Sequence, residues 1–154
     1  MVAAYCAARY AIRLPGGRRV MLEVGCTVPA PLEALANAHP SADEGLANGF
    51  ITAWNPHSQP ARRDDNRLRQ RDLLRRLRAS ARAVFVGAGY DAGWREPSLA
   101  ALGIRIDTLD GLAREFRQNA ILTFAPSGVV RLRMLRDDWR PALRNVDVDF
   151  APDA

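Results

Sequence analysis

Lysine is absent from this chain, and the residue types that define several specialised classes of protein are scarce. All 22 basic side chains are arginines. Only two histidines and two cysteines are present, and Cys6 and Cys26 have neither C-x-x-C nor metal-ligand spacing. These absences argue against a disulfide-rich scaffold and a structural metal site. We expect free or buried thiols, no metal and no cofactor.

Long apolar runs are also missing. No segment reaches the length that spans a bilayer, and the first ten residues lack the basic start and longer apolar core of a secretory signal. We therefore expect a cytoplasmic protein with no membrane partner. With 154 residues, of which 48% are hydrophobic and 25% charged, the chain fits one soluble domain with a substantial core.

The lack of lysine also bears on the net charge. A formal charge of +5 and an isoelectric point near 10.2 normally raise nucleic acid as a partner. Arginine without lysine, in a chain rich in alanine, is however typical of codon usage in a GC-rich genome. Charge alone is therefore weak evidence for nucleic-acid binding.

The chain begins with a predicted hairpin and a short helix. Apolar and polar residues alternate over 5–14 and again over 19–24, on either side of a Pro-Gly-Gly turn, which predicts a β-hairpin. Thr27 is expected to cap a helix that ends near Ala38, with prolines tolerated in its first turn. Both elements are expected to be structural.

A polar loop over 39–48 leads to a central strand that begins at Phe50. Alternation sends Phe50 and Ile51 to opposite faces. Pro56 cannot donate to a sheet ladder and biases Asn55 towards an extended conformation. The strand is therefore expected to end at Asn55, with polar side chains gathered at its end.

An arginine-rich helix follows, beginning at Asp64 or Asp65 and ending near Ala81. A helical wheel gives it one inward stripe, with most arginines pointing away from that stripe. The inward residues are Asn66, Gln70, Leu73, Leu77 and Ala81.

Beyond this helix, 83–86 predicts a short buried strand, and the glycine-rich run 87–93 predicts a turn. The run 94–103 is expected to be extended, with Glu96 and Ser98 pointing the same way. A third helix is expected from Asp107. Its apolar stripe is Leu109, Leu112, Ala113 and Phe116.

A closing hairpin is predicted over 120–124 and 129–135, joined by Pro-Ser-Gly. Residues 137–154 show no sustained period and are expected to form a partly ordered or flexible tail, pinned by Trp139. The pattern predicts an α+β fold over residues 1–136: a single domain with a mostly antiparallel sheet, hairpins at both ends and about three helices packed on it.

Polar side chains stand at the ends of several predicted elements, where sites are usually built. They could orient a small polar or nucleotide-like ligand, and Glu96, if buried with a raised pKa, could act as a general acid or base. A purely structural hydrogen-bond network remains the alternative. The candidate ligand-binding residues are Thr52, Asn55, Asn66, Ser98, Gln118 and Asn119.

The arginine-rich helix 64–82 is the basis of a second hypothesis, nucleic-acid binding. Its arginines are spread around the helix and no aromatic residues interleave with them, so a solvated face partly paired with neighbouring aspartates is the alternative. The candidate contacts are Arg67, Arg71, Arg75 and Arg78. A third hypothesis is an interaction module that uses the edge strands of the terminal hairpins.

Four segments stand out in order along the chain: T-A-W-N-P at 52–56, Asn66, W-R-E-P-S at 94–98 and F-R-Q-N-A-I at 116–121. In this order they resemble the bacterial domain-of-unknown-function 3293 family, and the resemblance covers roughly residues 5–135. Arg117 stands where the family has glycine, and the small Ala100-Ala101 pair stands in a position that is bulkier in the family. The resemblance implies an uncharacterised protein and supplies no activity.

Overall fold

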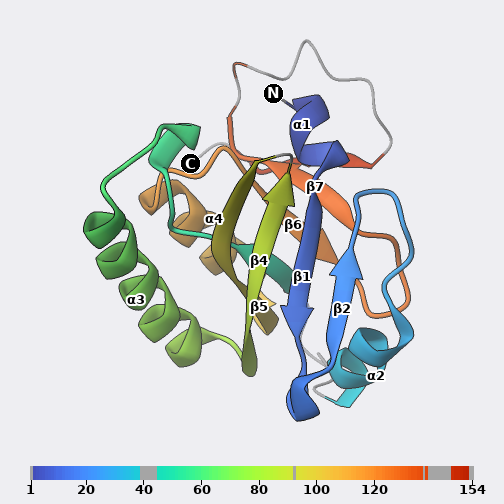
Figure 1. The fold of residues 1–154 in the computed structure, drawn as a ribbon. Helices are drawn as coiled ribbons and strands as arrows, with labels where there is room; N and C mark the ends of the chain where they lie inside the picture. Colours follow the sequence, from blue (N-terminus) through green and yellow to red (C-terminus); the bar gives the residue numbers. More distant parts are fainter. Residues whose placement is uncertain (1, 39–44, 92, 137, 139–146, 153–154) are drawn as a thin grey trace.

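The structure of the chain is a computed structural model, and it describes all residues except 1, 39–44, 92, 137, 139–146 and 153–154. The described residues form one eight-stranded sheet and four α-helices (Figure 1). The strands are β1 Arg9–Arg13, β2 Arg19–Leu22, β3 Leu46–Ile51, β4 Ala83–Asp91, β5 Trp94–Arg105, β6 Ala120–Phe124, β7 Arg131–Met134 and β8 Val148–Phe150. The helices are α1 Val2–Ala7, α2 Ala30–Ala38, α3 Arg63–Ser80 and α4 Ile106–Glu115, with short 3-10 turns η1 Pro15–Gly17 and η2 Pro56–Ser58.

The strands lie in the order β2-β1-β4-β5-β3-β6-β7-β8. All described pairings are antiparallel except that of β7 with β8. The predicted α+β class is therefore confirmed, and β3 occupies the interior position expected of the central strand.

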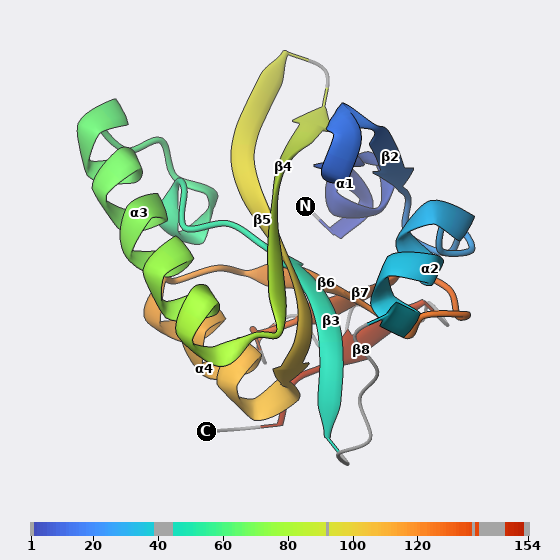
Figure 2. The ribbon, with the colours of Figure 1, turned by 90° about the horizontal axis from the view of Figure 1, so that it is seen from below.

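Two clusters of buried side chains lie on the two faces of the sheet. Phe50 packs with α2 and the outer strands in one cluster, and Ile51 packs with α3 and α4 in the other. Figure 2 shows α3 and α4 together on one side of the sheet and α2 on the other. Because strand residues alternate between faces, neighbouring residues of β3 help to build separate layers.

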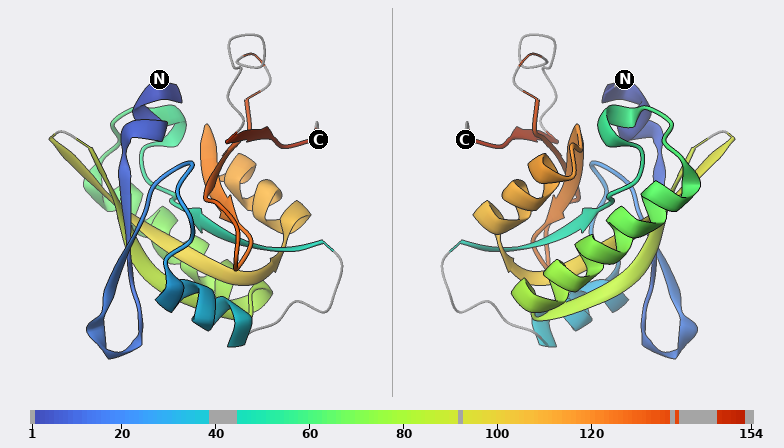
Figure 3. Two further views of the ribbon diagram at one scale, coloured as in Figure 1. Left: turned by 90° about the vertical axis from the view of Figure 1, so that its right-hand side faces the viewer. Right: turned by 90° about the vertical axis from the view of Figure 1, so that its left-hand side faces the viewer.

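The sheet is strongly curved, as both views in Figure 3 show. Its curvature brings the segment after β2 against the segment before β7, where Thr27 forms a β-bridge with Val129. Gly25 donates its backbone N–H to Val130 at 2.8 Å, and Val130 donates to Cys26 at 2.9 Å. The predicted cap at Thr27 is thus wrong: this residue is held in a bridge, and α2 begins at Ala30.

The central strand ends at Ile51, which pairs with Leu99, and the prediction that it extends to Asn55 is wrong. Pro97 of β5 has no N–H to donate beyond that point, so the ladder between β3 and β5 cannot continue. The Pro97 carbonyl accepts a hydrogen bond from Thr52 Oγ1 at 2.8 Å instead. β5 itself continues beside β4, so one end of the β4–β5 hairpin projects past β3.

The predicted turn is shorter than the glycine-rich run: residues 87–91 lie in β4, and the turn is confined to the end of the run, before Trp94. A Cβ atom on Gly87 would lie 2.6 Å from the Ala11 carbonyl oxygen and 2.6 Å from Phe50 Cε2. Gly89 lies beneath the rings of Trp94 and Tyr10. Gly87 is therefore required where the Phe50 ring lies against the strand, whereas a Cβ at Gly89 would be in ordinary van der Waals contact with the two rings.

Two further differences concern the ends of the chain. Residues 5–7, predicted as the start of the first strand, lie instead in α1, in keeping with the alanine-rich composition of that segment. The predicted tail contributes β8, whose backbone pairs with β7. Trp139, the residue expected to pin the tail, lies outside the described residues, as does most of the predicted loop before β3. No helix in the described part of the chain has the length and apolar character that crossing a membrane requires.

Candidate functional site

The predicted polar residues gather where β3 leaves the sheet. The Asn55 side chain donates from Nδ2 to Glu96 Oε1 at 2.7 Å, and its Oδ1 accepts from Asn66 Nδ2 at 2.9 Å. The Asn55 backbone N–H donates to Asn66 Oδ1 at 2.9 Å. Since Asn66 lies in α3 and Glu96 in β5, this chain of hydrogen bonds joins three distant segments.

The other predicted residues belong to the same network. Ser98 Oγ donates to the Glu96 carbonyl at 3.1 Å, and Gln118 Nε2 donates to the Trp54 carbonyl at 3.0 Å. Asn119 Nδ2 donates to Ser58 Oγ at 3.0 Å and to the Tyr5 hydroxyl at 3.2 Å. These side chains therefore lie near one another, and most of their polar atoms are used to hold loops in place.

Asn66 has a structural part in this network. It is 1% exposed, and both its amide nitrogen and its oxygen have protein partners. Its amide binds the loop that connects β3 to α3. A buried amide in this position stabilises the loop rather than offering free groups to a ligand.

The backbone is strained beside this network. Asn55, His57, Ser58 and Arg117 are the described non-glycine residues with positive φ. Asn55, expected to be extended, has φ 47° and ψ 67°. Asparagine tolerates this region, and the hydrogen bonds to Asn66 and Glu96 fix it there. The His57 N–H donates to the Arg117 carbonyl at 2.7 Å, which couples the two strained segments.

A cavity of about 50 Å³ lies on the face of the sheet that carries Phe50. It is lined by Thr52, Asn55, Glu96, Ser98 and Gln118, together with Tyr5, Tyr10, Ser58, Trp94 and apolar side chains. Burial raises the pKa of the Glu96 carboxyl, and the hydrogen bond from Asn55 opposes that effect. The cavity is far smaller than the several hundred Å³ of a nucleotide pocket.

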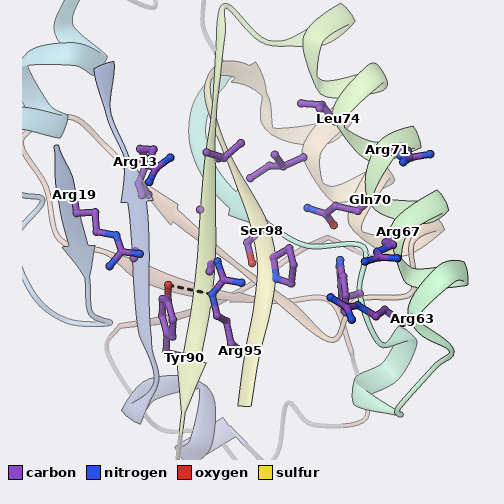
Figure 4. Close-up of a pocket in the computed structure, with 18 residues that line it drawn as sticks. Arg13, Arg19, Arg63, Arg67, Gln70, Arg71, Leu74, Tyr90, Arg95 and Ser98 are labelled. Atoms are coloured by element: carbon purple, nitrogen blue, oxygen red, sulfur yellow. Dashed lines mark hydrogen bonds between the residues drawn. The ribbon is translucent and has the colours of Figure 1, made fainter. Parts of the chain in front are cut away.

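A larger groove of about 760 Å³ lies on the opposite face, between α3 and the strands β1, β2, β4 and β5 (Figure 4). Six arginines line it: Arg13, Arg19, Arg63, Arg67, Arg71 and Arg95. Figure 4 shows three of them on α3 and the others on the strands across the groove. Apolar side chains lie between the two rows, among them Leu74 and Val86, which is 55% exposed.

Most of these arginines have no acidic partner among the residues that the structure describes. Arg67 lies 3.3 Å from Asp64, but none of the other five forms an ion pair within the described part of the chain. Arg95 instead lies over the Tyr90 ring and donates to its hydroxyl, which lowers the pKa of Tyr90. The groove is therefore a surface of concentrated, uncompensated positive charge.

Of the four arginines predicted to contact nucleic acid, two line the groove and two lie outside it. Arg67 and Arg71 line the groove, whereas Arg75 pairs with Asp72 and Arg78 lies outside the groove. The strand arginines of the groove were not predicted. Arg13 and Arg19 pair across the first hairpin and so share a face. The alternation of that hairpin already placed them opposite its buried residues, which was the available signal.

The groove and the cavity are separated by the sheet. Arg95, Pro97 and Leu99 line the groove, and Glu96 between them faces the cavity. Ser98 borders both. A ligand lying in the groove would therefore not reach the Glu96 carboxyl. Among the described residues, no group of three or more histidine, cysteine, aspartate or glutamate side chains is placed to hold a metal ion.

The fold and these two sites define a small α+β protein with an arginine-lined groove on one face of its sheet and a polar cavity on the other. Residues 51–121 match the family model described as "Protein of unknown function (DUF3293)", which confirms the resemblance seen in the sequence. The matched segment contains α3, the β4–β5 hairpin and Glu96. No curated protein and no solved structure matches the chain.

Proposed function

We propose that this protein binds a phosphate-bearing, nucleotide-like ligand in the arginine groove. The observation that carries the proposal is the convergence of six arginines from α3 and three strands on one groove, five of them without an acidic partner among the described residues. Like charges held this close repel one another, and an anion placed among them removes that repulsion.

The chemistry of the groove suits phosphate together with a flat apolar group. Arginine presents a planar fork of N–H donors that matches phosphate oxygens. Trp54, Tyr90 and the apolar floor between the two arginine rows offer contacts to a base or sugar. The groove volume of about 760 Å³ lies within the range of small-molecule pockets. Glu96 has no part in this proposal, because it faces the other side of the sheet.

Isothermal titration calorimetry with ATP at low salt tests the proposal, comparing wild type with the double variant Arg71→Gln and Arg95→Gln. Each lost charge-assisted hydrogen bond is worth about 1.5 kcal/mol or more, so the double variant should bind at least about 100-fold more weakly. Arg78→Gln is the matched control, since Arg78 is exposed on the same helix but lies outside the groove.

Two results would contradict the proposal. Wild type could fail to bind ATP, GTP and inorganic tripolyphosphate alike. The control substitution could also weaken binding as much as the groove double variant, which would indicate a general effect of net charge.

Single-stranded nucleic acid is the second candidate ligand. Two exposed arginines lie further along α3, outside the groove: Arg78, and Arg75, which pairs with Asp72. A strand running from the groove along α3 would use these arginines, whereas a mononucleotide would not. This difference separates the two candidates experimentally.

A further inference from the structure

The inner face of the β4–β5 hairpin carries a hollow whose chemistry is opposite to that of the groove. Gly89 pairs with Tyr10 of β1 on one side and with Glu96 of β5 on the other, so the three residues form a row across neighbouring strands. Paired residues share a face of the sheet. Because the middle residue has no side chain, the rings of Tyr10 and Trp94 lie over its position, and the remaining gap beside the Glu96 carboxylate is part of the cavity.

Aromatic rings wall this gap. A Cβ on Gly89 would lie 3.4 Å from ring atoms of Trp94 and 3.5 Å from Tyr10 Cδ1, so both rings border the position of the missing side chain. Tyr10 meets Phe50 edge to face, with ring centroids 5.5 Å apart. Tyr5 lies at the same cavity and is fixed by its 2.5 Å hydrogen bond with Ser58.

The composition of the cavity lining is unusual for this chain. Four aromatic residues and one carboxylate line it, and no arginine of the described part of the chain does. Glu96, Tyr5 and Tyr10 are the titratable groups in the lining, and all three are acids. Glu96 accepts from Asn55 through Oε1, and no hydrogen bond to its second oxygen is formed by the described residues.

We propose that this cavity binds a small organic ammonium ion, with the Glu96 carboxylate as the counter-ion and the faces of Tyr5, Tyr10, Phe50 and Trp94 as the walls. Aromatic faces attract cations through their quadrupole, and a carboxylate supplies the full negative charge. A cavity of about 50 Å³ accommodates a head group of a few heavy atoms. The site is independent of the groove, because it lies on the other face of the sheet.

The test is calorimetric titration of wild type with methylammonium and tetramethylammonium chloride, at constant ionic strength against sodium chloride. We expect saturable binding of at least one ammonium ion, weakened at least about tenfold in Glu96→Gln and in Trp94→Leu. Glu23→Gln, which removes an exposed carboxylate elsewhere, should bind as wild type does. Absence of saturable binding, or equal binding by wild type and Glu96→Gln, would overturn the proposal.

A second measurement covers the case in which Glu96→Gln does not fold. In wild type, methylammonium affinity should fall as pH is lowered through the range in which the Glu96 carboxyl resonance titrates by NMR. An affinity that stays constant through that range would also overturn the proposal. ATP binding in the groove should be unchanged in Glu96→Gln, so failure of this site and failure of the groove are separate outcomes.

Discussion

At Glu96, burial disfavours the ionised form of the side chain, which is the form proposed to bind a cation. Its carboxyl is half-buried beside aromatic rings, and burial raises its pKa. A carboxyl whose pKa is higher in the folded state binds its proton more tightly there than in the unfolded chain. The folded state therefore loses stability relative to the unfolded state as pH rises above the unfolded pKa of about 4.3 and through the raised folded value.

The raised pKa predicts how the stability of Glu96→Gln depends on pH. Glutamine keeps the shape of the side chain and cannot ionise. The free energy of unfolding of the variant should therefore increase relative to that of wild type as pH rises through this window. Urea denaturation of both proteins from acidic to neutral pH measures the difference. A constant difference across the window would mean that the pKa of Glu96 is not raised by folding.

The burial of Asn66 could be predicted from the sequence, but its hydrogen-bond partners could not. The helical wheel predicted it as the first inward residue of the arginine-rich helix, and it is buried. The wheel could not identify its partners, because Asn55 and Ala61 reach it only through the path of the connecting loop. The same loop places Asn55 in a positive-φ conformation that local preference before proline did not predict.

At the scale of elements, the β4–β5 hairpin positions both sites. Its alternation gives one face to the arginine groove and the other to the aromatic cavity. The hairpin is long because Gly87 and Gly89 continue β4 where the glycine-rich composition predicted a turn. Composition alone could not distinguish the two, since glycine serves turns and close packing equally well.

The role of Gly87 can be tested by Gly87→Ala. The added Cβ would lie 2.6 Å from a backbone oxygen and from the Phe50 ring, so we expect a loss of about 2 kcal/mol or more in the free energy of unfolding. Gly111→Ala is the matched control in α4, where a Cβ meets nothing within 4 Å. It should stabilise the protein by about 0.5–1 kcal/mol. Urea denaturation measures both, and equal effects of the two variants would refute the packing argument.

At the scale of the whole molecule, positive charge is gathered rather than spread evenly. Arginines that are distant in sequence meet at the groove, while no described arginine lines the cavity on the other face. Many of the remaining arginines are paired, as in the buried pair of Arg133 with Asp110, whose closest atoms are 2.7 Å apart. Net charge therefore understates the local field at the groove.

This distribution predicts how the two candidate ligands differ. Arg75→Gln with Arg78→Gln should weaken binding of a single-stranded oligonucleotide and leave ATP binding unchanged. For an oligonucleotide, the logarithm of the affinity should fall with the logarithm of salt concentration by about 0.7 per phosphate contacted. Fluorescence anisotropy over a salt series measures this slope. Weak oligonucleotide binding whose affinity does not change with salt concentration would contradict the nucleic-acid candidate.

The sequence by itself determined the α+β class, the buried stripes of α3 and α4 and the two faces of β3, because periodicity reports which side of an element is apolar. It also identified, as candidate site residues, the polar side chains that lie together where β3 ends. Only the tertiary structure decided that these residues mostly hold loops, and that six arginines from separate segments share one groove. Periodicity describes each element alone, whereas the curvature of the sheet and the register of its strands determine which residues of different elements meet.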